Sequence, residues 1–86
     1  MEVSLLEFPC DFPIKVMGES GDDFTAAMLA VVLRHAPDFD LATMERRSSK
    51  GGRYSSLTCT IRATSQQQLD DLYREITAHP LVVMAL

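Results

Sequence analysis

Hydrophobic and polar residues alternate most clearly between Tyr54 and Ala63. A period of two residues is typical of a β-strand with one buried face. The apolar side of this stretch consists of Leu57, Cys59, Ile61 and Ala63. Serine and glycine residues at positions 48–52 precede it, and both residue types form turns readily. The pattern predicts the tip and the descending strand of a β-hairpin.

Two other stretches repeat their apolar residues every three to four positions, as amphipathic helices do. The first spans Phe24 to His35 and follows Asp22 and Asp23, which we interpret as an N-cap and first-turn carboxylates. The second begins at a capping box, in which Ser65 and Gln68 satisfy each other's backbone N–H groups.

Three further segments are expected to be strands: Phe12 to Gly18, Phe39 to Arg47, and Leu81 to Leu86. Proline has no N–H to donate, so pairing of the first strand should begin just after Pro13. Residues 1–11 then form an N-terminal arm.

The element order is β-α-β-β-α-β within one domain, residues 1–86. Two interleaved right-handed crossovers predict an α+β, ferredoxin-like sandwich, a four-stranded antiparallel sheet with two helices on one face. The first and third strands lie in the centre of the sheet. The predicted core consists of Phe24, Met28, Val31, Leu57, Ile61, Leu69, Leu72 and Ile76.

The last strand, Leu81 to Leu86, carries no charge and no proline, although the topology places it at an edge of the sheet. An edge of this kind pairs with another chain unless something covers it. We therefore expect one of two arrangements. Either the arm, with Leu5, Leu6 and Phe8, covers the strand, or two copies pair into a homodimer.

Length and composition indicate the cellular compartment. The chain has 86 residues, no apolar run long enough to cross a bilayer, and acids rather than basic residues at its N-terminus. These features favour a cytoplasmic protein without membrane contact. Cys10 and Cys59 lack the spacing of a metal site, and a reducing compartment disfavours a disulfide between them.

Little in the sequence suggests catalysis. His35 and His79 each lie at the C-terminus of a predicted helix, where histidine commonly caps carbonyls or meets the helix dipole. Neither has a carboxylate or cysteine at ligand or triad spacing. Ser48 and Ser49 lie outside any G-x-S-x-G nucleophile elbow. We expect no enzyme activity, no metal and no cofactor.

Charge is distributed unevenly along the chain. The net charge is −4, yet the segment from Arg46 to Leu69 holds five basic residues and no acid. The rest of the chain has three basic and 12 acidic residues, a net charge of −9. The predicted anion- or partner-binding residues are Arg46, Arg47, Ser48, Ser49, Lys50 and Arg53. The alternative interpretation is a solvated turn whose charges protect an edge.

RNA-recognition modules share this fold, and they stack bases on aromatic side chains of the central strands. Here the third strand offers only Tyr54 as an aromatic, and its open face otherwise carries Thr58, Thr60 and Arg62. A nucleic-acid-binding module that uses the basic hairpin Arg46 to Arg53 is therefore the second hypothesis.

Five ordered motifs resemble the YbeD-like family of small uncharacterised bacterial proteins: L-L-E-F-P at 5–9, K-V-M-G at 15–18, R-H-A-P at 34–37, S-S-K-G at 48–51 and T-I-x-A-T at 60–64. One departure is a hairpin tip that is one residue longer, S-S-K-G-G-R-Y. The resemblance implies a cytosolic, ferredoxin-like protein akin to the ACT regulatory domains, with a loose association with lipoate metabolism. It implies no catalytic residue. We expect a stand-alone regulatory or interaction module that acts on a partner protein or a small effector.

Overall fold

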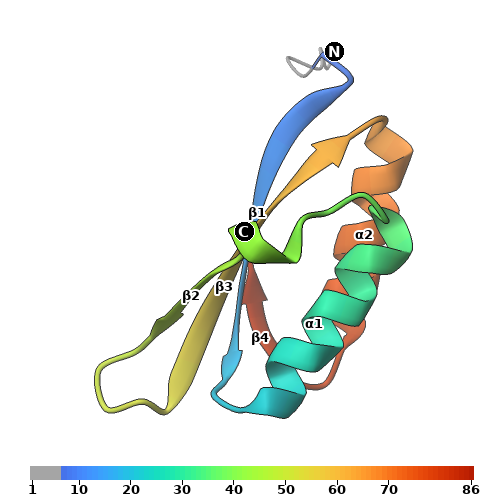
Figure 1. Cartoon of the computed structure of the whole chain (residues 1–86). Helices are drawn as coiled ribbons and strands as arrows, with labels where there is room; N and C mark the ends of the chain where they lie inside the picture. Colours follow the sequence, from blue (N-terminus) through green and yellow to red (C-terminus); the bar gives the residue numbers. More distant parts are fainter. Residues whose placement is uncertain (1–6) are drawn as a thin grey trace.

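A computed structural model describes residues 7–86, in which both helices cover the same face of one antiparallel sheet (Figure 1). The elements are β1 (Cys10–Glu19), α1 (Asp22–His35), the 3-10 helix η1 (Leu41–Thr43), β2 (Glu45–Ser48), β3 (Tyr54–Ala63), α2 (Gln66–Ala78) and β4 (Val82–Ala85). The strand order is β2-β3-β1-β4, which places β1 and β3 in the centre. The predicted ferredoxin-like α+β fold is confirmed.

The hydrophobic core lies between the sheet and the two helices. It forms because alternate residues of β1 and β3 face the helices, and each helix turns an apolar stripe toward them. All eight predicted core residues are buried. The core also includes Ile14, Val16, Val32, Cys59 and Ala63, so it extends along both central strands.

β1 begins earlier than the sequence predicted. Its pairing with β3 starts at Cys10 and includes Pro13, which lies opposite Thr60. Lys15 exchanges both of its backbone hydrogen bonds with Leu86, at 3.2 and 2.8 Å, so its N–H and C=O point away from β3. The backbone of Pro13, two residues earlier in the same strand, has the same orientation. β4 does not reach Pro13. The N–H that Pro13 lacks therefore removes no hydrogen bond from the sheet.

The predicted N-terminal arm is correspondingly shorter than residues 1–11. Its last two residues belong to β1, and Phe8 is half-buried against the core. Leu5 and Leu6 lie outside the described residues, and so does the prediction that they cover the last strand.

The predicted second strand, Phe39 to Arg47, is wrong over most of its length. Asp40 accepts a hydrogen bond at Oδ1 from the Ala42 N–H (3.0 Å) and caps η1, so this segment turns before the short strand β2 begins. Phe39 is nevertheless buried, because the loop that precedes η1 directs it into the core.

The helix caps also differ in detail. The N-cap of α1 is Gly21, without a side-chain bond, and Asp22 and Asp23 lie in the first turn. At α2 the Ser65 Oγ accepts from the Gln68 N–H (3.1 Å), as predicted. The Gln68 side chain, however, accepts from the Thr64 N–H (2.7 Å) rather than from Ser65.

Candidate functional site

The tip of the β2–β3 hairpin has a defined turn conformation. The Ser49 N–H donates to the Tyr54 carbonyl (2.7 Å), and the Tyr54 N–H donates back to Ser49 Oγ (3.0 Å). The Gly52 N–H closes a tight turn on the Ser49 carbonyl (2.9 Å). Gly51 and Gly52 adopt φ values of 90° and 75°, which other residues rarely tolerate. Ser49 therefore serves the turn itself.

Strand alternation separates the two adjacent arginines of β2. Arg47 lies opposite Ser56 and on the open face of the sheet, the face that neither α1 nor α2 covers. Arg46 lies opposite the buried Leu57 and so on the helix-facing side, where it is still exposed. The predicted set does not form one patch, and Arg47 rather than Arg46 shares a face with Tyr54.

A small hollow of about 80 Å³ opens at the base of the tip. Met17, Ser56 and Arg47 lie in one cross-strand row of the open face. The full lining is Met17, Arg47, Ser48, Ser49, Tyr54, Ser55 and Ser56. A guanidinium and several hydroxyl groups next to an aromatic ring and a thioether can hold an anionic group with an apolar neighbour.

Arg53 is positioned by Tyr54. Its guanidinium carbon lies 5.3 Å from the centre of the Tyr54 ring, a cation–π contact. Its backbone carbonyl accepts from the Ser20 N–H (2.9 Å), and Ser20 Oγ also bonds Ser55 Oγ (2.8 Å). These bonds attach the hairpin to the turn between β1 and α1, although the tip projects away from both helices (Figure 1).

Two acidic residues outside the basic segment Arg46 to Leu69 lie close to the hairpin in space. Glu19 is directly opposite Tyr54, and Glu45 precedes Arg47 by two residues on the same face. The positive character is therefore concentrated beyond Tyr54 rather than spread over the hairpin. Within residues 7–86, none of Arg47, Lys50 and Arg53 takes part in an ion pair.

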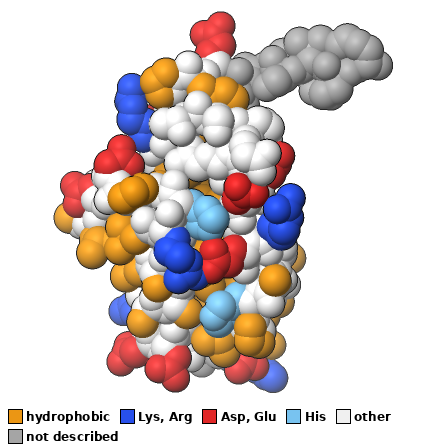
Figure 2. All heavy atoms as spheres, turned by 90° about the vertical axis from the view of Figure 1, so that its right-hand side faces the viewer, with side chains coloured by type: hydrophobic (Ala, Val, Ile, Leu, Met, Phe, Trp, Pro, Cys, Tyr) orange, Lys and Arg blue, Asp and Glu red, His pale blue; other side chains and the backbone are white. Residues whose placement is uncertain are grey.

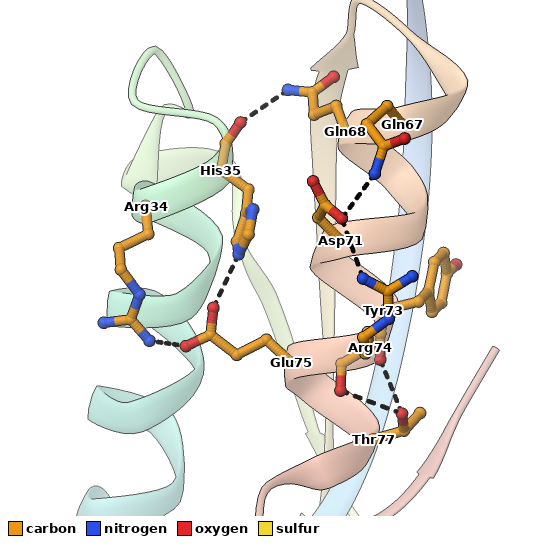
Figure 3. Close-up of polar contacts among 9 residues, drawn as sticks. All are labelled: Arg34, His35, Gln67, Gln68, Asp71, Tyr73, Arg74, Glu75 and Thr77. Carbon is orange, nitrogen blue, oxygen red and sulfur yellow. Dashed lines mark hydrogen bonds and ion pairs between the residues drawn. The ribbon is translucent and has the colours of Figure 1, made fainter.

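The histidines differ from the prediction in one respect. His79 is the C-cap of α2, and its Nδ1 accepts from the Leu81 N–H (3.1 Å). His35, for which no carboxylate neighbour was expected, bonds Glu75 Oε1 through Nε2 at 2.7 Å (Figure 3). Arg34 pairs with the other Glu75 oxygen. The separation of 40 residues hides this pair from any local motif.

The surface of the helical layer carries basic, acidic and histidine side chains among apolar ones (Figure 2). Across residues 7–86, no group of three His, Cys, Asp or Glu residues is placed to hold a metal ion. A wider hollow of about 260 Å³ lies at the start of α1 and is lined partly by Glu19, Asp22 and Asp23. In the same part of the chain, neither helix is long and apolar enough to cross a membrane.

Fold and surface together define a small α+β domain of the ferredoxin-like class. A solved structure, protein HP0495 from H. pylori, matches with a TM-score of 0.76 over 99% of this chain and 89% of that one, at 14% identity.

Residues 3–86 match the family described as "Protein of unknown function (DUF493)". A UPF0250 protein of Nitrosomonas europaea is 58% identical and covers 99% of this chain and 98% of its own length. A UPF0250 protein of Bordetella pertussis is 53% identical, with 99% and 93% covered. The chain belongs to this family, which confirms the resemblance to YbeD-like proteins.

Proposed function

We propose that the protein is a non-catalytic interaction module that docks the acidic surface of a partner protein through the hairpin tip. The observation that carries the proposal is the arrangement of Arg47, Arg53 and Tyr54. The Arg53 guanidinium lies over the Tyr54 ring, and Arg47 and Tyr54 both line the small hollow. Within residues 7–86, neither arginine takes part in an ion pair. Arginine and tyrosine are the residue types that dominate binding energy at protein interfaces.

Preorganisation supports the same proposal. The turn bonds between Ser49 and Tyr54 hold the backbone of the tip, and the ring of Tyr54 restrains Arg53. Side chains that are already ordered lose less entropy when a partner binds. The exposed cations also attract an acidic surface from a distance, which raises the association rate more than the affinity.

The biological setting is part of the proposal. The family resemblance implies an ACT-like regulatory module, so we propose a cytoplasmic partner and lipoate metabolism as its context. A small effector at this site would best be an anion, because Arg47 and several hydroxyl groups line the hollow.

Nucleic acid is the less favoured partner. Tyr54 is the one aromatic residue on the open face of β3, and single-strand readers stack successive bases on several rings. Glu19 and Glu45 would also lie near a bound phosphate backbone.

The test compares two doubly reversed variants that change the net charge equally. Arg47→Glu with Arg53→Glu alters the tip, whereas Arg62→Glu with Arg74→Glu alters exposed arginines elsewhere. Each protein is used as bait in bacterial cytosol, and captured proteins are quantified. We expect the tip variant alone to lose its partner at least tenfold, and to associate with the purified partner more slowly at low salt.

Equal capture and equal association rates for both variants would reduce the tip to a solvated turn. Retention that disappears after nuclease treatment, together with steeply salt-dependent binding of RNA or DNA, would support the nucleic-acid hypothesis instead. Unchanged circular dichroism would confirm that both variants are folded.

A further inference from the structure

Among residues 7–86, no strand pairs with the outer edge of β4. The strand pairs with β1 on its inner side, through residues Val16 to Gly18. Leu86 exchanges both of its backbone hydrogen bonds with Lys15, so its N–H and C=O point toward β1. Because these groups alternate along a strand, the N–H and C=O of Ala85 point the other way, toward the open edge.

This edge is also where exposed apolar side chains gather. Four large hydrophobic residues in the described part of the chain are exposed, and three of them lie here: Val83 (62%), Met84 (48%) and Leu86 (65%). Residues 82–86 contain no charged side chain and no proline. Soluble proteins commonly place charged side chains or a proline on an exposed edge strand, and this prevents pairing with another chain.

The opposite edge of the same sheet is protected. β2 presents Glu45, Arg46 and Arg47 in succession, all of them exposed. A second β2 placed against it would bring arginines close together, and β4 placed against it would set apolar side chains among charges. Pairing of β2 in one copy with β4 in another would leave a free edge at each end, so further copies could add without limit. Pairing of β4 with β4 gives a closed dimer with a twofold axis.

We propose that β4 pairs antiparallel with β4 of a second copy and forms a continuous eight-stranded sheet. A second copy is the occupant that the side chains favour, because an edge without charged side chains meets itself without repulsion between side chains and without burying an unpaired charged side chain. Met84 lies beside Met17 in the register of β1 and β4. The dimer would therefore carry a strip of methionines from both copies across its open face.

The interface is expected to be weak. β4 has four residues, and the register shifts between Met17 and Gly18, so the regular edge is short. A strand pair of this length falls at the low end of specific interface sizes. Dimerisation should be visible in the range of about 10–500 μM by sedimentation equilibrium, consistent with a small interface.

The decisive variant is Ala85→Pro. It removes an N–H that points to the open edge, and proline is tolerated in a sheet where its N–H side faces solvent. Val83→Lys adds a charge to the same edge, and Thr60→Lys adds the same charge to an exposed site on β3 as a control. We expect both edge variants to weaken the dimer at least tenfold and the control to leave it unchanged.

A full chain that stays monomeric at 500 μM would overturn the proposal. It would also be overturned if the chain dimerised only after removal of residues 1–6, because those residues would then cover the edge. A dimer that the edge variants leave intact would assign the interface elsewhere. None of these results bears on the hairpin tip, which lies at the other side of the sheet.

Discussion

The imidazole of His35 and the carboxylate of Glu75 join the two helices, with His35 Nε2 2.7 Å from Glu75 Oε1. Arg34 binds the second oxygen of the same carboxylate, so one residue of α2 contacts two consecutive residues at the end of α1. A further bond runs from Gln68 Nε2 to the His35 carbonyl (2.7 Å). These contacts set the position of α2 against α1 (Figure 3).

Glu75→Ala should destabilise the protein by about 1 kcal/mol, because it removes two charge-assisted contacts at a partly exposed site. Arg74→Ala is the matched control. It removes one exposed pair with Asp71 within the same helix, and its effect should stay below about 0.5 kcal/mol. Urea denaturation measures both, and equal effects would show that the interhelical cluster adds nothing.

Leu72→Ala should cost about 2–5 kcal/mol, since Leu72 is fully buried between α2 and the sheet. Leu41→Ala makes the same chemical change at a side chain that is 50% exposed, and should cost less than about 1 kcal/mol. Thermal denaturation separates the two. A Leu72 variant that melts close to wild type would contradict the packing of α2 on the sheet.

Gly18→Ala should destabilise the fold by about 1–3 kcal/mol through overpacking. A Cβ at Gly18 would lie inside van der Waals contact of the Leu81 carbonyl oxygen and the Phe24 ring. Both neighbours are constrained, because Phe24 is buried and the other atom belongs to the backbone. If chemical denaturation gave the wild-type free energy of unfolding, this close approach would not exist.

Alkaline pH should destabilise the protein through Cys59. Burial raises the pKa of the Cys59 thiol from 9.0 to about 11. Between these values the unfolded chain loses the thiol proton while the folded chain keeps it, so stability falls from about pH 9 to about pH 11 and then levels off. The loss should be about 2–3 kcal/mol.

Cys59→Ala isolates this contribution. The difference in unfolding free energy between wild type and variant should narrow over the same pH window. A constant difference between wild type and the Cys59 variant would show that the thiol is not protected from ionisation.

The arginines of the tip could be named from the sequence, because five basic residues without an acid are a local signal. Their separation onto two faces could not, since the register of β2 against β3 decides it. The predicted strand over 39–47 failed for a similar reason. Asp40 forms bonds within its own segment that compete with an extended backbone, and alternation alone does not reveal them.

The sequence by itself determined the order of helices and strands and the eight core residues, because burial of one face imposes a period of two on strands and of 3.6 on helices. The tertiary structure alone decided which distant side chains meet. Glu75 reaches His35, Glu19 lies opposite Tyr54, and β4 stops short of Pro13. Such pairs depend on strand register and helix placement, which arise from the packing of the whole core and leave no periodic trace along the chain.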